Sequence, residues 1–404
     1  MSQSHTNSAK IGIATATIVG MNAMIGSGVF TMPGVLAQSV GPAGIITTIL
    51  VACCAYFMAA SIARVAYLFP QEGSFYTYAR QWGGHRMGIV ASGAYLIGLI
   101  IAMGLLCKVA GVYLQHYIPS LTDHTLGFIT LLALVILNMV GVTLSELGQH
   151  ILIVCTTFPL IATIVMCFTK MNLSNLTPFT PHGIMPIFSA SKEVLFSFFG
   201  FEAAASLFAV VRDPEKNVPR ALVYSLAIVS VLYILFAWAI LTTTPLSLLP
   251  GPFSALSDAL RHVFPTHPWL IESIHFSILS AIVGTIHSMV WSSGSLLIAL
   301  VKKLQSAPMR ALAQSRYLTT PLAVLVIGTC IFASFTLITG NLFFLLTAVF
   351  IVFAYMASMV TLLTIPSEWR NGQNKKTVIG LATALVIFAF ATYDLAHAVI
   401  LLFR

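Results

Sequence analysis

Charged residues are scarce in this sequence. Asp, Glu, Lys and Arg together make up 7% of its 404 residues, whereas 58% are hydrophobic and the mean hydropathy is +0.96. A soluble globular domain carries about a quarter charged residues. The lack of charge therefore excludes a soluble globule and indicates a protein that crosses the membrane many times.

Cysteine is rare as well, and no two cysteines have the CxxC spacing of a metal or redox site. The six cysteines lie in apolar stretches, where we expect them to behave as small hydrophobic side chains. The 11 histidines show no ligand spacing, and the sequence contains neither HExxH nor GxSxG. We therefore expect no cofactor, no metal and no enzymatic activity.

Long apolar stretches dominate what is present. About 20 apolar residues suffice to cross the roughly 30 Å hydrocarbon core of a bilayer. Eleven stretches meet this length: residues 11–32, 41–68, 88–114, 126–144, 151–168, 194–211, 221–243, 274–301, 321–339, 342–365 and 377–402. We expect each of them to be a membrane span.

The distribution of positive charge predicts the orientation. With residues 1–10 as a cytoplasmic tail, most of the 19 Lys and Arg residues fall in cytoplasmic loops, as the positive-inside rule requires. We expect a multi-pass protein of the plasma membrane, or of the inner membrane of a bacterial cell. The net charge of +8 then follows from orientation and from attraction to anionic lipid, and it needs no nucleic-acid partner.

A polar segment divides the spans into two sets. Residues 171–190 are rich in Asn, Thr and Pro and lack helical periodicity, which predicts a long external linker after the fifth span. The chain then divides into residues 1–170, residues 171–365, and residues 366–404 with the eleventh span. Because five is odd, the two halves run in opposite directions, which is the inverted-repeat plan of many secondary transporters. The first span should correspond to the sixth.

Both of these corresponding spans contain glycine near the middle. The first has Gly26, Ser27 and Gly28, and the sixth has Gly200 close to Glu202. Glycine lets a helix unwind, and the exposed N–H and C=O groups can then line a protein-enclosed site for a polar ligand. The alternative is that these glycines only allow close helix contact. The matched positions in the two spans favour unwinding.

Four motifs resemble those of the amino acid–polyamine–organocation transporters, in that family's order and over about the first 225 residues. They are GSGVF at 26–30 followed by GPAG at 41–44, FPQEGSFYTY at 69–78, FFGFEAA at 198–204, and DPEKNVPRA at 213–221. In the second motif Ser74 stands where the family commonly has a glycine.

The resemblance implies an all-α, LeuT-like fold with a 5+5 inverted repeat and discontinuous spans one and six. It also implies an α-amino acid or amine bound between these two spans, with spans three, eight and ten closing the pocket. The segment SFFGFEAA is most similar to the basic amino acid and polyamine antiporter branch. Phe196 stands where arginine–agmatine exchangers of that branch carry a gating tryptophan, and Trp291 resembles one of its aromatic pocket residues.

Helix dipoles suggest how such a ligand lies. Its carboxylate would meet free N–H groups near Ser27, at the start of the second half of span one. Its ammonium would face carbonyls near Ile25 and residues 199–201, and aromatic side chains would wall the side-chain pocket unless they face lipid or the core. The predicted substrate-binding residues are Ile25, Gly26, Ser27, Gly28, Phe196, Phe199, Gly200, Phe201 and Trp291. Neutral and cationic ligands, import and export all remain open.

Glu202 is the predicted site of proton coupling. A carboxylate at mid-span costs about 2.5 to 3.5 kcal/mol on insertion scales, so it is protonated, paired or facing a cavity. Burial favours its neutral form and an approaching amine favours its charged form. The alternative role is a permanent hydrogen bond to unwound backbone.

Two further ionisable residues lie within spans. Lys108 either reaches the outer interface or a structural partner, or takes part in coupling. His287 is either a satisfied helix contact or a second titrating group. Sodium competes with the proton as coupling ion, since Ser292 and Ser293 offer hydroxyls. The sequence thus predicts a secondary amino acid or amine transporter, with a channel, a sensor and a membrane enzyme as the alternatives.

Overall fold

The computed structural model describes residues 10–140, 142–249, 256–304, 306–315, 317–338, 340, 342–370 and 374–402. The predicted cytoplasmic tail lies outside the described residues except for Lys10. Within the described ranges the regular elements are helices, which confirms the all-α expectation.

Nine helices in the described part are long and apolar enough to cross a membrane. They are α3 (Gly44–Leu68), α4 (Ser74–Gln115), α5 (Asp123–Val140), α6 (Val142–Thr169), α9 (Pro214–Thr243), α11 (Pro268–Lys303), α13 (Thr320–Leu337), α14 (Leu342–Thr364) and α16 (Asn374–Leu402). Short helices occupy several connections: η1 (Leu173–Leu176), α7 (Met185–Ser189), η3 (Leu246–Leu248), α10 (Leu256–Val263), α12 (Ala307–Gln314) and α15 (Ser367–Arg370).

The two remaining predicted spans, the first and the sixth, are broken. The first consists of α1 (Ile13–Met24) and α2 (Gly28–Ser39), which are bent by 41° at the intervening residues. The sixth consists of α8 (Ser191–Phe196), a turn through Gly200, and the 3-10 helix η2 (Phe201–Leu207). The expectation of discontinuous spans one and six is confirmed.

Several predicted boundaries differ from the structure: α6, α9 and α11 begin before the predicted residues 151, 221 and 274, and the fourth span ends at Val140 instead of residue 144. The third span was expected from residue 88, but α4 begins at Ser74 and continues through a kink at Gly84, where φ is 66° and ψ is −166°. Hydropathy marks the apolar part of a helix and misses its polar extension into the loop. The external linker also contains two short helices, η1 and α7. The side chain of Asn172 caps the start of η1, and Pro186 lies in the first turn of α7.

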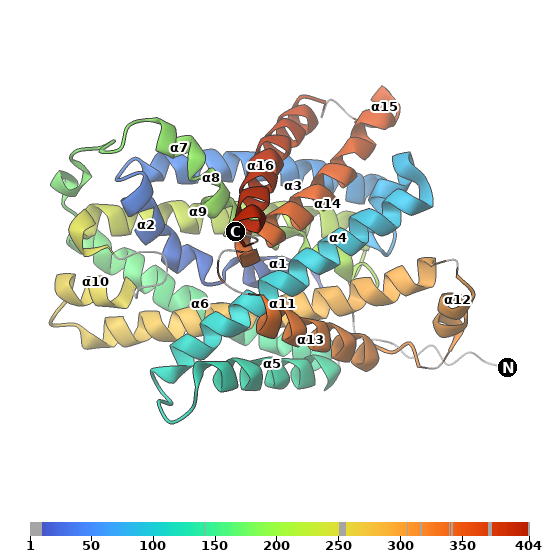
Figure 1. Cartoon of the computed structure of the whole chain (residues 1–404), viewed down its shortest axis with the longest axis horizontal. Coiled ribbons are helices and arrows are strands. Elements are labelled where there is room, and N and C mark those ends of the chain that lie inside the picture. The colour runs from blue at the N-terminus through green and yellow to red at the C-terminus, as the bar shows by residue number, and fades with distance from the viewer. Residues whose placement is uncertain are drawn as a thin grey trace.

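The two halves of the chain interlock. In span numbers, the second (α3) packs against the seventh (α9), the fifth (α6) against the eighth (α11), and the third (α4) against the tenth (α14). Figure 1 shows α4 crossing the bundle obliquely, with α16 beside α14 and α3. The broken first span lies between α9, α11, α6 and η2, so both breaks are enclosed by protein.

Candidate functional site

The breaks in spans one and six lie against each other. A methyl group added at Gly28 would lie 2.5 Å from Oγ of Ser197, and one added at Gly200 would lie 2.5 Å from the carbonyl oxygen of Ala23. Gly200 also has a φ of +115°, which L side chains rarely adopt. The glycines therefore permit both the unwinding and the close contact, which the sequence presented as alternatives.

Hydroxyl groups from neighbouring helices hold the broken ends. Tyr233 of α9 donates to the carbonyl of Met24 at 2.8 Å and to that of Ser197 at 3.0 Å, so one side chain serves both breaks. Thr285 of α11 donates to the carbonyls of Asn22 at 2.8 Å and Ile25 at 3.2 Å. These bonds replace part of the helical hydrogen bonding that the breaks remove.

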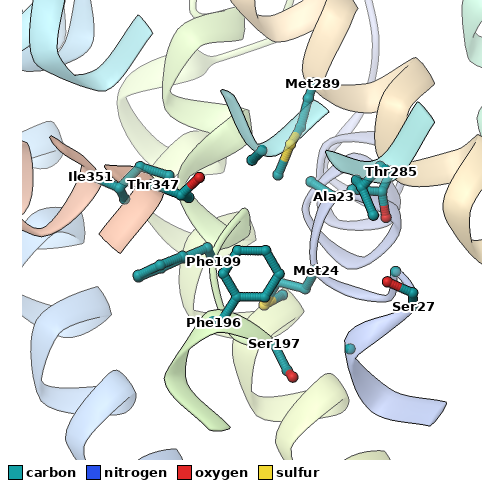
Figure 2. Close-up of a pocket in the computed structure, with 14 residues that line it drawn as sticks. Ala23, Met24, Ser27, Phe196, Ser197, Phe199, Thr285, Met289, Thr347 and Ile351 are labelled. Atoms are coloured by element: carbon teal, nitrogen blue, oxygen red, sulfur yellow. The ribbon is translucent and has the colours of Figure 1, made fainter. Parts of the chain in front are cut away.

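A small cavity lies at the breaks (Figure 2). Its empty volume is about 380 Å³, which includes its opening to the outside. Its walls come from spans one, three, six, eight and ten, and all the lining residues are uncharged: Ala23, Met24, Gly26, Ser27, Gly28, Ala102, Leu106, Phe196, Ser197, Phe199, Thr285, Met289, Thr347 and Ile351. The cavity is therefore a neutral site that is partly open.

Five of the nine predicted substrate-binding residues line this cavity: Gly26, Ser27, Gly28, Phe196 and Phe199. The other four are buried around it without being among its lining residues. Ile25 ends α1, Gly200 forms the turn before η2, Phe201 packs on Tyr355 with ring centroids 5.3 Å apart, and Trp291 lies in the core of α11. In span eight the cavity wall is formed by Thr285 and Met289.

The N–H groups at the start of α2 have no carbonyl partner within the helix. The first N–H groups of a helix, here those of Gly28 and Val29, have no carbonyl earlier in the helix to bond. Ser27 at the cap position makes no side-chain capping bond, and its own carbonyl accepts from the N–H of Phe30 at 3.1 Å. The positive end of the α2 dipole adds to these donors.

Glu202 is completely buried in η2, next to the cavity but outside its lining. Its Oε2 accepts from the N–H of Gly200 at 3.1 Å, whereas Oε1 has no hydrogen-bond partner among the described residues. The hydroxyls of Tyr95 and Tyr355 lie close enough to interact with the carboxyl, yet neither makes a hydrogen bond of normal geometry within the described part. This cluster thus has unused hydrogen-bonding capacity.

An aromatic layer separates the cavity from the start of α4. The ring of Phe75 lies 4.2 Å from that of Tyr95 and 6.0 Å from that of Tyr355, measured between centroids. Tyr355 in turn lies 6.1 Å from Phe199, which lines the cavity. On the opposite side of the cavity, at the start of span six, the ring of the half-buried Phe196 packs on that of Phe344 with centroids 4.9 Å apart. Aromatic side chains thus lie between the cavity and both ends of the bundle.

The two secondary candidates lie away from the cavity. The Nζ of Lys108 donates to the carbonyl of Ile338 at 2.7 Å and lies 5.1 Å from the centroid of the Phe343 ring. His287 is fully buried and has two partners, with Asn138 Nδ2 at 2.8 Å from Nδ1 and the Ser145 carbonyl at 3.2 Å from Nε2. Both side chains therefore have structural contacts that account for their positions.

The hydroxyls considered for sodium are both buried. Ser292 and Ser293 have no hydrogen-bond partner among the described residues, and Ser292 lies beside the hydroxyl of Tyr95. In the same part of the chain no group of three or more His, Cys, Asp or Glu residues is placed to hold a metal ion.

The sequence profile of a family described as amino acid permease matches residues 11–403. Two curated relatives are named branched-chain amino acid permease BcaP. The one from Bacillus subtilis is 25% identical over 56% of this chain and 53% of its own length, and the one from Lactococcus lactis is 25% identical over 66% of this chain and 61% of its own length. The chain thus spans between half and two thirds of these relatives.

Among solved structures, MhsT in complex with L-phenylalanine superposes with a TM-score of 0.68 at 13% sequence identity, covering 95% of this chain and all of MhsT. This similarity supports the LeuT-like fold. The names of the two permeases also correct one expectation, because the sequence is not closest to the basic amino acid and polyamine antiporter branch. The expectation rested on the eight residues SFFGFEAA around Glu202, and so short a segment is a weak basis for choosing a branch.

Proposed function

Because the chain belongs to the amino acid permease family, we propose that it is a secondary active transporter for a neutral α-amino acid. One observation carries this proposal: two helices are broken at facing positions beside an uncharged cavity. A ligand site between two broken helices suits alternating access.

The geometry supports a definite pose. The α-carboxylate lies against the N–H groups of Gly28 and Val29 and the hydroxyl of Ser27, at the positive end of α2. The α-ammonium faces the carbonyl end of α1, near Ala23 and Ile25, where the helix dipole is negative. The side chain then points toward Phe196, Met289 and Ile351.

The cavity lining favours a neutral side chain. A charged side chain would lose its hydration in this cavity, and none of the lining residues carries an opposite charge to replace it. This argues against the cationic substrates that the sequence left open. The names of the two branched-chain permeases are consistent with a neutral substrate.

Glu202 couples transport to protons in this proposal. The carboxyl has one oxygen without a partner, lies between the unwound turn at Gly200 and the hydroxyls of Tyr95 and Tyr355, and is shielded from water. Protonation would let it donate a hydrogen bond within this cluster, and loss of the proton would favour opening toward water. We place the N-terminus in the cytoplasm. The start of α4 then lies on the cytoplasmic side, and the aromatic layer of Phe75, Tyr95 and Tyr355 closes the cavity on that side.

Uptake into proteoliposomes tests the function. We expect saturable uptake of a neutral amino acid that unlabelled substrate inside the vesicles accelerates and that a proton gradient drives. Gly28→Ala should abolish it, because the new methyl group meets Ser197, whereas Gly93→Ala in α4 should not, because nothing lies within 4 Å of that position.

Three results would count against the proposal. Non-saturable flux would indicate a channel, and ligand binding without flux would indicate a sensor. Uptake driven by a sodium gradient and indifferent to pH would assign coupling to sodium and remove Glu202 from this role.

A further inference from the structure

Thr347 of α14 has a buried hydroxyl without a partner. The residue is completely buried and lines the cavity, and its Oγ1 has no hydrogen-bond partner among the described residues. Most helical Thr and Ser side chains bond a carbonyl one turn earlier. Ser358 on the same helix does this, donating to Ala354 at 2.9 Å. Thr347 therefore keeps a donor and an acceptor unused where an unpaired polar group is costly.

The position of this hydroxyl separates it from the groups that hold the α-carbon substituents. Figure 2 shows Thr347 across the cavity from Ser27 and Thr285, with its oxygen turned toward the space between Met289 and Phe199. A ligand whose carboxylate and ammonium lie at the break of span one thus presents its side chain to Thr347. The other residues of this wall are apolar: Ala102, Leu106, Phe196, Phe199, Met289 and Ile351.

We propose that Thr347 is a specificity-determining residue that hydrogen-bonds a hydroxyl on the substrate side chain, so that the site selects small hydroxy amino acids such as threonine over apolar isosteres such as valine. This inference rests on the proposed transport function and adds the substrate class. The cavity is small, with an empty volume of about 380 Å³ including its opening, and this favours a short side chain. A substrate hydroxyl would either donate to the Thr347 oxygen or accept from its O–H, which gives the buried Thr347 hydroxyl a partner.

Threonine and valine test this proposal well because they differ by one hydroxyl for one methyl group at nearly equal volume. Inhibition constants of both are measured against uptake of a labelled neutral amino acid, with the full chain in proteoliposomes. One hydrogen bond corresponds to roughly a three- to tenfold preference for threonine in the unmodified protein. Thr347→Val should bring the ratio of the two inhibition constants to about one or reverse it, while the inhibition constant of valine does not rise. Thr347→Ser should keep the preference for threonine.

Thr364→Val provides the matched control, because Thr364 lies at the end of the same helix, is exposed, and bonds the carbonyl of Thr361. It should leave the ratio unchanged. Equal inhibition by threonine and valine in the unmodified protein would overturn the proposal even if Thr347→Val failed to fold. A threonine preference that survives Thr347→Val would also overturn it. In both cases transport itself is observed, whereas absence of any amino acid uptake would reject the transport function.

Discussion

Removing the hydroxyl of Tyr233 tests whether the two breaks are held in place from outside the broken spans. Tyr233→Phe keeps the ring, which packs on Phe198 with centroids 5.1 Å apart, and deletes only the donor shared by the carbonyls of Met24 and Ser197. The residue is completely buried, so water does not replace the lost bonds.

The expected magnitude follows from these two contacts. Hydrogen bonds between membrane helices contribute about 0.6 kcal/mol on average and up to about 1.7 kcal/mol. Because the two carbonyls share the single O–H of Tyr233, we expect a loss of about 1 kcal/mol, which is roughly a fivefold change in an equilibrium constant. The loss should appear both as a lower thermal midpoint and as weaker substrate binding, since the released carbonyls no longer keep one position.

Tyr224→Phe is the control for this measurement. Tyr224 lies on the same helix but is half exposed, so loss of its hydroxyl should change neither quantity. Purified protein in detergent gives the thermal midpoint, and ligand titration of that midpoint gives the relative affinity. If Tyr233→Phe matches the unmodified protein and Tyr224→Phe in both measurements, the reasoning about externally held breaks is refuted.

Three other substitutions test separate parts of the structure. Glu202→Gln imitates the protonated carboxyl and should make proteoliposome uptake independent of pH. The control Glu72→Gln removes only the exposed ion pair with Lys302 at 3.8 Å and should retain the pH dependence. If uptake by Glu202→Gln keeps the pH profile of the unmodified protein, the coupling role is rejected. Gly200→Ala should cost about 2 to 4 kcal/mol, from a disfavoured φ and a contact with the backbone of Ala23, and should abolish transport; normal uptake would show that the breaks need not touch. Ser74→Gly should stabilise the protein by about 1 kcal/mol, because Ser74 has a φ of +29° and a buried hydroxyl without a partner in the described part; an unchanged thermal midpoint would contradict this.

The sequence predicted the breaks for a physical reason. Glycine in the middle of a membrane span has a conformational cost, so Gly26, Gly28 and Gly200 indicated positions where the helix does not continue. The same pattern predicted a site between spans one and six, and a cavity lies at these breaks. Hydropathy likewise located the spans, although it missed the polar first turns of α4 from Ser74 onward.

The remaining walls of the cavity could not be read from the sequence. A helix buried in a membrane bundle is apolar on the faces toward lipid, core and cavity alike, so periodicity does not report which face a residue occupies. Trp291 was expected in the pocket, and the structure places Met289 there, on the same helix. Thr347, Thr285 and Tyr233 gave no signal because Thr and Tyr are common in membrane helices, and their roles depend on contacts with distant segments.

The backbone ends of the two broken spans are joined on the side where residue 10 lies. The N–H of Ile11 donates to the carbonyl of Val210 at 2.8 Å, and the N–H of Arg212 donates to the carbonyl of Ile11 at 2.9 Å. These two bonds connect the segment before α1 to the segment after η2, which are some 200 positions apart along the chain. A swing of α1 away from the bundle must therefore either carry the end of span six with it or break both bonds.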